Sequence, residues 1–321
     1  MITVTNTASK KIQASEIKAL HIELSSLCNA RCPLCPRNFR GYPYNRGYEE
    51  TNLTLAKIQT LLPVEFLQQI TEILISGNHG DFVMNPESVE ILSWLKSVNP
   101  TVFMHVSTNG GARDRSFWQS LAELDIEINF CIDGLEDTHH IYRQDTTYEQ
   151  VIRNATTYIE AGGQANWVMT QFDHNEHQLG EAKHRAQELK FKNFLVRDIG
   201  RNTSPVYNRE GKRIFIMRSS TEFPEQLTDN FIKYRINQEL MTVTKKTTVS
   251  CEAFNSRSLY INASGIVKPC CWLDIKTIQP TQFTEMNTAD TIDTGIEWFN
   301  KVIEQNKISP LQICRSKCGL C

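Results

Sequence analysis

The chain has 321 residues, of which 40% are hydrophobic and 22% charged, the ordinary composition of a protein with a buried core. Its 34 Lys and Arg residues against 36 Asp and Glu leave a formal charge of −2, which argues against a protein that binds nucleic acid through excess positive charge. The sequence lacks both a run of eighteen apolar residues and the charged start and apolar block of a signal peptide. We therefore expect a cytoplasmic protein, long enough for one large and one smaller domain.

Up to about residue 200, short apolar runs alternate with segments of helical period. The runs cover residues 19–24, 72–75, 102–106, 127–132, 167–169 and 194–196. Asn85-Pro86-Glu87 opens a helical segment that extends to Val98, and a second one over 148–161 ends in two glycines. Strand–helix alternation repeated about six times predicts a parallel α/β sheet or barrel.

After residue 200 this alternation stops. Residues 201–249 are polar and without a clear period, which predicts a linker or irregular connection. Residues 259–268 predict a β-hairpin that turns at Asn262-Ala263-Ser264-Gly265, and residues 291–306 predict a last helix. The predicted organisation is an N-terminal extension (1–17), an α/β domain (18–200), a connection (201–249) and a small cysteine-rich domain (250–321).

Ten cysteines form two clusters, with Cys131 alone between them. Cys28, Cys32 and Cys35 lie close to the start. The last 71 residues hold Cys251, Cys270, Cys271, Cys314, Cys318 and Cys321. Disulfide frameworks are typical of small secreted domains, so the clusters favour a metal or an iron–sulfur cluster.

The first cluster has the spacing C-x3-C-x2-C and directly follows the first predicted strand. Three thiolates from one loop can ligate three irons of a [4Fe–4S] cluster, which leaves one iron open to a substrate or cofactor. A zinc site with a fourth ligand elsewhere is the alternative.

This motif resembles that of the radical S-adenosylmethionine (SAM) superfamily, and further fragments resemble the same family in order. Residues 76–81 resemble the family's Gly-Gly-Glu turn, which binds the methionyl amino group. Residues 107–110 resemble its Thr-Asn-Gly, and residues 131–134 its Ser-x-Asp-Gly, which faces the ribose. Arg143 corresponds to an arginine near the SAM carboxylate. The implied SAM contacts are Gly77, Asn78, Asp81, Ser107, Thr108, Asn109, Asp133 and Arg143. The resemblance implies a partial (β/α)6 TIM-type barrel over residues 18–200, with active residues at the carboxyl ends of its strands.

Strand alternation places Cys131 on the same face as Asp133. If that face is the barrel interior, the thiol lies near the cofactor and is a candidate catalytic residue; a packed core cysteine is the alternative. The histidines at 139, 140, 174 and 177 have no ligand spacing and are interpreted as surface residues.

The C-terminal cysteines resemble the SPASM/twitch extension of many radical SAM enzymes, in the shorter twitch form with one auxiliary [4Fe–4S] cluster. The implied ligands are Cys251, Cys270, Cys318 and Cys321, with Cys314 as a rival. Cys271 follows Cys270 directly and so faces the opposite way on a strand. A four-cysteine zinc site is again the alternative.

The resemblance implies an oxidoreductase that cleaves SAM reductively to a 5′-deoxyadenosyl radical and abstracts hydrogen from an unactivated C–H bond. Net oxidation through the auxiliary cluster is expected, on a peptide or a small molecule, with an electron donor such as flavodoxin or ferredoxin. A peptide would dock directly or through a separate recognition protein. The alternatives are a redox-neutral epimerase with Cys131 or Cys271 as hydrogen donor, a non-catalytic metal scaffold, and a nucleic-acid-modifying enzyme, against which the near-neutral charge argues.

Overall fold

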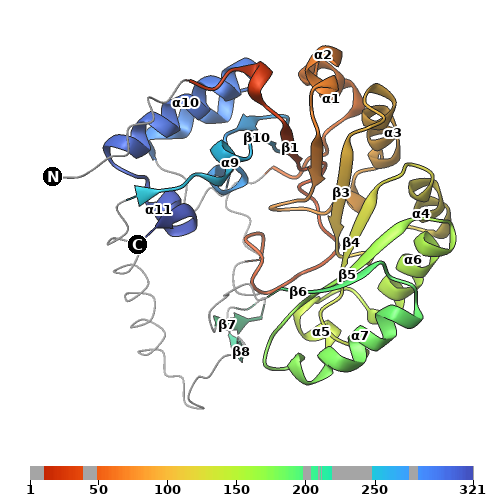
Figure 1. Ribbon diagram of the computed structural model, residues 1–321. Helices are drawn as coiled ribbons and strands as arrows, with labels where there is room; N and C mark the ends of the chain where they lie inside the picture. Colours follow the sequence, from red (N-terminus) through yellow and green to blue (C-terminus); the bar gives the residue numbers. More distant parts are fainter. Residues whose placement is uncertain are drawn as a thin grey trace.

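In the computed structural model, the described residues are 11–38, 49–197, 204–208, 210, 212–218, 248–274 and 281–320. Six parallel strands follow one another in space as in the sequence, and helices cover their outer face (Figure 1). The strands are β1 (Ala19–Ile22), β2 (Glu72–Ile75), β3 (Phe103–Thr108), β4 (Glu127–Cys131), β5 (Gln164–Thr170) and β6 (Asn193–Arg197). All six match the predicted runs, and the predicted partial barrel is confirmed.

The helices of this barrel alternate with the strands. They are α1 (Leu55–Leu61), α2 (Val64–Gln68), α3 (Ser88–Val98), α4 (Arg115–Ala122), α5 (His139–Tyr142), α6 (Tyr148–Glu160) and α7 (Leu179–Glu188). Alternation along each strand decides which side chains enter the core beneath the helices. On β4, for example, Ile128 and Phe130 are fully buried in this core, whereas Glu127, Asn129 and Cys131 face the barrel interior.

The C-terminal segment extends the same sheet. Strand β10 (Ser258–Ile261) pairs in parallel with β1, and β11 (Val267–Lys268) pairs antiparallel with β10, which confirms the predicted hairpin. Among the described residues the sheet therefore has eight strands, in the order β11-β10-β1-β2-β3-β4-β5-β6. Helix α10 (Ile292–Ile308), also predicted, packs against β11 and buries Phe299 in the barrel core.

The described C-terminal part also contains two short α-helices, the 3-10 helices η5 (Cys271–Asp274) and η6 (Thr281–Thr288), and one strand pair. Helix α9 (Glu252–Asn255) precedes β10, and α11 (Gln312–Cys318) lies beside it near the C-terminus (Figure 1). Strand β9 (Thr248–Val249) pairs with β12 (Gly319–Leu320). Within the described residues, no helix combines the length and the apolar character needed to cross a membrane.

The connection predicted to be irregular contains ordered structure in its described part. Strands β7 (Ser204–Tyr207) and β8 (Arg213–Met217) form an antiparallel hairpin. Val206 and Met217 are buried against Ala30 and Cys32, so this hairpin packs on the first cysteine loop. Of the other residues between 201 and 249, the structure describes only Asn208, Glu210, Lys212, Arg218 and strand β9. The prediction for the remaining ones lies outside the described residues.

Candidate radical SAM site

The first cysteine loop follows β1 and lies where the neighbouring strands end. Each of its three thiols contacts a residue after a different strand. The sulfur of Cys28 accepts from the Asn109 amide at 3.7 Å, and that of Cys32 from the Arg143 guanidinium at 3.5 Å. The Cys35 thiol lies 4.0 Å from the Asn78 carbonyl. The segments that follow β2, β3 and β4 thus contact the loop, with Arg143 located directly after α5.

The electrostatics of this loop suit a metal cluster. Burial, with smaller contributions from neighbouring thiols, raises the pKa of the Cys28 thiol well above its ordinary value. The same causes raise the pKa of Cys32 to about 11, although the nearby Arg143 lowers it. Neutral thiols are therefore favoured when no cation is bound, and bound iron would supply the positive charge that stabilises three thiolates. The donor set fits a [4Fe–4S] cluster held by Cys28, Cys32 and Cys35.

Asn109 fixes the loop through a reciprocal amide pair. Its Nδ2 donates to Asn29 Oδ1 at 3.0 Å, and Asn29 Nδ2 donates to Asn109 Oδ1 at 3.3 Å. Asp81 positions Asn109 in turn: its carboxylate accepts from the Asn109 backbone N–H at 2.7 Å and from the Thr108 hydroxyl at 2.8 Å. Because both Asp81 oxygens are occupied and the side chain is buried, its contribution to the site runs through Thr108 and Asn109.

The turn after β2 has no room for side chains at its glycines. A Cβ on Gly77 would lie 2.1 Å from the Gly80 carbonyl oxygen, and one on Gly80 would lie 1.9 Å from the carbonyl oxygen of Ser25. Only glycine fits at either position. The turn therefore packs its backbone directly on the segment that leads into the cysteine loop.

Asp133 and Arg143 form a buried ion pair at the end of β4. Arg143 Nε donates to Asp133 Oδ2 at 2.5 Å, and the other Asp133 oxygen accepts from the backbone N–H of Thr170. Asp133 is fully buried, and its negative charge helps to raise the pKa of Arg143. Arg143 thus places a permanent positive charge between Asp133 and the Cys32 sulfur.

Cys131 lies on the interior face of β4, which is the condition under which the sequence makes it a candidate catalytic residue, and it is partly buried. Burial raises the pKa of its thiol, while the nearby Arg143 lowers it. His139, interpreted as a surface residue, is instead fully buried: its Nδ1 accepts from the Asp133 N–H at 3.3 Å, and burial lowers its pKa to about 4. His140 and His177 are exposed, and His174 is partly buried.

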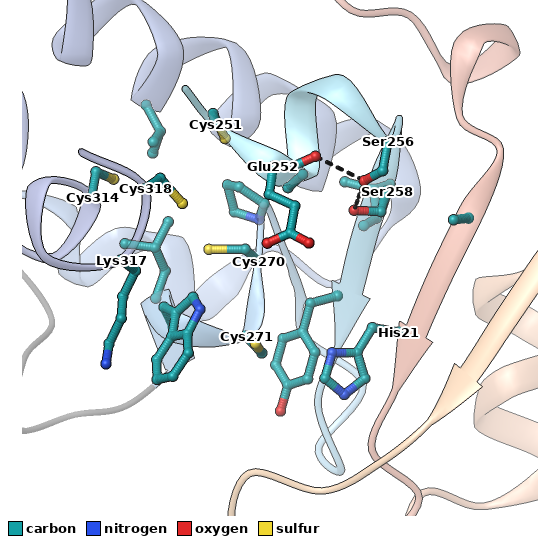
Figure 2. A pocket seen from close by; sticks show the side chains of 18 of the residues that line it. His21, Cys251, Glu252, Ser256, Ser258, Cys270, Cys271, Cys314, Lys317 and Cys318 are labelled. Atoms are coloured by element: carbon teal, nitrogen blue, oxygen red, sulfur yellow. Dashed lines mark hydrogen bonds between the residues drawn. The ribbon is translucent and has the colours of Figure 1, made fainter. Parts of the chain in front are cut away.

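A second site lies between α9, α11 and the hairpin, around a cavity of about 390 Å³. Its described thiols are those of Cys251, Cys270, Cys271, Cys314 and Cys318. Figure 2 shows Cys271 apart from the other four, toward His21. Cys314 and Cys318 are four residues apart on α11 and share one face of that helix. The structure thus brings the rival ligand Cys314 into the site, while Cys321 lies outside the described residues.

These thiols lie near enough to influence one another. Burial is the main cause that raises the pKa of Cys251, Cys270 and Cys314, and repulsion among the neighbouring thiols adds to it. Among the residues that the structure describes, no three Cys, His, Asp or Glu side chains converge on a single-ion site. Several cysteine thiols around one cavity are the donor type that holds an iron–sulfur cluster.

Sequence reasoning missed a buried polar group beside this second site. Glu23, Tyr260, Lys268 and Asp274 are each at least 94% buried and connect β1 to the hairpin. For Glu23 a signal existed, because alternation with Leu20, Ile22 and Leu24 points it away from the helices. Nothing local distinguishes Lys268, whose Nζ lies 2.6 Å from Asp274 Oδ1.

A parallel-stranded partial barrel, with an open three-cysteine loop at the carboxyl ends of its strands, defines a class of cluster-dependent enzymes. The family model of the radical SAM superfamily matches residues 22–186, just over half of the chain. The protein therefore belongs to the radical SAM superfamily. It is an enzyme that uses a [4Fe–4S] cluster and SAM for radical chemistry.

Solved structures share this fold at low sequence identity. SuiB of Streptococcus suis bound to S-adenosylmethionine has a TM-score of 0.56 at 16% identity, over 94% of this chain and 72% of that one. SuiB bound to the precursor peptide SuiA has a TM-score of 0.56 at 14% identity, over 96% and 73%. The enzyme anSMEcpe with bound AdoMet and Cp18Cys peptide has a TM-score of 0.50 at 17% identity, over 94% and 88%. No curated protein sequence matches the chain.

Proposed function

We propose that this enzyme is an oxidoreductase of the SPASM/twitch type that removes hydrogen from an unactivated C–H bond of a peptide. The observation that carries the proposal is the pairing of two cysteine sites on one sheet: an open three-cysteine loop beside β1, and a cavity beside β10 that five described cysteines line. Three ligands suit a cluster that also binds SAM, whereas four suit a closed cluster that exchanges electrons.

Each proposed role falls to particular residues. Cys28, Cys32 and Cys35 hold the first cluster, which together with SAM supplies a 5′-deoxyadenosyl radical. The proposed SAM contacts are the backbone of Gly77 and Asn78 together with Ser107, Thr108, Asn109 and Arg143, and Asp81 and Asp133 position them. Residues 250–321 hold the auxiliary cluster through Cys251, Cys270 and Cys318, with Cys314 or Cys321 as the fourth ligand.

A peptide substrate is supported by the peptide-bound structures of SuiB and anSMEcpe, which share the fold of this chain. The peptide docks directly or through a separate recognition protein, and flavodoxin or ferredoxin delivers the electron.

The test is anaerobic reconstitution of the protein, followed by iron and sulfide analysis and an assay for 5′-deoxyadenosine with dithionite and SAM. We expect about eight irons per chain in the wild type and about four in the double variant Cys251→Ser, Cys318→Ser. Cys28→Ala should abolish nucleoside release. Bound zinc, or the same iron content in the double variant, would contradict the proposed auxiliary cluster.

A redox-neutral epimerase is the second candidate, supported by the position of Cys131 on the interior face near Arg143 and Asp133. In that reaction the thiol would return a hydrogen atom to the substrate radical. Deuterium would then enter the product from D2O, and Cys131→Ala would stop that incorporation. A product that gains no deuterium and has lost two hydrogens excludes this alternative and supports net oxidation.

A further inference from the structure

A buried polar junction joins the turn after β2 to the C-terminal hairpin. We define it as Glu23, Asn78, Tyr260, Asp274 and the carbonyl of Cys271. The Tyr260 hydroxyl donates to Glu23 Oε2 at 2.5 Å, and Glu23 Oε1 accepts from the backbone N–H groups of His79 and Gly80 at 2.7 and 2.9 Å. Glu23 and Tyr260 are each 1% exposed, so water cannot replace these hydrogen bonds.

Asn78 is the point at which the junction touches both cysteine sites. Its carbonyl oxygen lies 4.0 Å from the Cys35 sulfur, on the side of the first loop. Its side-chain Nδ2 donates to the carbonyl of Cys271 at 2.8 Å and lies 3.4 Å from the Tyr260 hydroxyl. Cys271 directly follows Cys270, one of the thiols that line the second cavity (Figure 2).

The turn is too tightly packed to absorb a displacement of this junction. Gly77 and Gly80 already lie against carbonyl oxygens with no space for a Cβ. Glu23 in addition accepts hydrogen bonds from the backbone N–H groups of His79 and Gly80. A shift of the hairpin that pulls on Asn78 or Tyr260 therefore moves the backbone of residues 77–80. Close packing transmits such strain instead of dissipating it.

We propose that Asn78 and Tyr260 are positioning residues through which the C-terminal cysteine site controls how tightly the turn at residues 77–80 binds SAM. The proposal rests on the proposed function, in which this turn contacts SAM and the second site holds a cluster. Because coupling between two sites is reciprocal, SAM also stabilises the second site. Glu23 joins Tyr260 to the backbone of this turn, and Asp274 Oδ2 lies 3.3 Å from the Tyr260 hydroxyl and 3.7 Å from His79 Nε2.

The experiment is a double-mutant cycle on SAM affinity, measured by equilibrium dialysis with the reconstituted full chain. Cys251→Ser, Cys318→Ser disables the second site without touching the junction. Tyr260→Phe removes one hydroxyl from the junction and leaves every cysteine of both sites in place. We expect each change to weaken SAM binding roughly two- to tenfold, the range of one buried hydrogen bond. The combined variant should be no weaker than the worse of the two.

Tyr158→Phe is the matched control. Tyr158 is another fully buried tyrosine, whose hydroxyl donates to the Ile126 carbonyl at 2.7 Å, outside the junction. It should lose stability as Tyr260→Phe does, yet bind SAM like the wild type. Asn78→Ala is the second junction variant. In its background, the cysteine substitutions should likewise cause no further loss of SAM affinity.

Hydrogen–deuterium exchange of the metal-free protein gives a readout independent of activity. We expect faster exchange at the N–H groups of residues 79 and 80 in Tyr260→Phe, and unchanged exchange there in Tyr158→Phe. The proposal is overturned if the cysteine variants weaken SAM binding equally in the wild-type and Tyr260→Phe backgrounds. A wild-type protein that carries the first cluster and binds no SAM would instead contradict the proposed function itself.

Discussion

Two of the buried acidic groups beside the proposed radical SAM site have different kinds of partner. Asp133 and Arg143 pair at the end of β4, while Glu23 lies at the end of β1 with Tyr260 and two backbone N–H groups. Removing charged groups from water is costly unless each finds a partner. The partners differ, because Asp133 has a cation beside it, whereas Glu23 has only neutral donors within hydrogen-bond distance.

The absence of a cation beside Glu23 predicts an unusual pH dependence. Burial raises the pKa of Glu23 from 4.5 to about 7, although its hydrogen bonds with Tyr260, His79 and Gly80 oppose this shift. A raised folded-state pKa means that the stability from neutral Glu23 is complete below about pH 4.5 and is lost as the pH rises through 7. The wild type should therefore lose about 2–3 kcal/mol through this group between pH 5 and 8.

Glu23→Gln isolates that contribution, since glutamine has the same shape and no titration. Relative to the wild type, the variant should gain about 2–3 kcal/mol of unfolding free energy between pH 5 and 8, measured by urea denaturation of the metal-free protein. Other titrating groups, including His79 and His139, are common to both proteins and cancel. Parallel pH profiles for the two proteins would show that Glu23 titrates in its ordinary range.

Arg143→Met should destabilise the metal-free protein by about 3–5 kcal/mol, because it leaves the fully buried Asp133 without its cation. The double variant Arg143→Met, Asp133→Asn removes both charges and should recover much of that loss. Urea denaturation of the three proteins measures both effects. A single variant as stable as the wild type would mean that the ion pair contributes no net stability, and the Arg143 charge would then serve the Cys32 sulfur alone.

At the scale of elements, the sequence predicts the strands best. All six barrel strands were predicted from apolar runs bounded by turn residues, and the C-terminal hairpin and helix α10 from turn chemistry and helical period. These signals are local. The hairpin β7–β8 was missed because its first strand carries Pro205 among polar residues, although the run Ile214-Phe215-Ile216-Met217 was available as a signal.

The glycines of the turn after β2 give a prediction at this scale. Gly80→Ala places a Cβ within 1.9 Å of the Ser25 carbonyl, so the cysteine loop and the turn must separate. We expect a loss of at least ~3 kcal/mol in unfolding free energy and a fall in iron bound at the first site. Gly180→Ala is the control: its Cβ meets nothing within 4 Å on α7, and it should add ~0.5–1 kcal/mol. Equal stability of the two variants would contradict the close packing of the turn.

At the scale of the whole molecule, the sequence could predict two cysteine sites but not how they are joined. The pairing of β1 with β10 connects residues about 240 positions apart, and no local pattern encodes that register. The same holds for His139, which lacks ligand spacing and was taken for a surface residue, yet is buried by contacts with Asp133 and Thr146. Tertiary packing, not local propensity, decides such positions.

This shared sheet predicts that the barrel does not fold without its C-terminal segment. Deleting residues 250–321 removes β10 and exposes the whole edge of β1. It also removes Phe299 from the barrel core, the Tyr260 partner of Glu23, and the two hydrogen bonds between Asn300 and the backbone of Ile12. The truncated chain should aggregate or unfold without a cooperative transition, as followed by circular dichroism and size-exclusion chromatography.

The full-length variant Cys251→Ser, Cys318→Ser separates the loss of the segment from the loss of its ligands, since it keeps the sheet and the core. It should unfold cooperatively in the metal-free state, within about 1–2 kcal/mol of the wild type, because half-buried cysteines tolerate a change to serine. A truncated chain that unfolds cooperatively would mean that residues 18–200 form an independent domain. Association with residues 250–321 would then serve the chemistry of the second site and not the stability of the first.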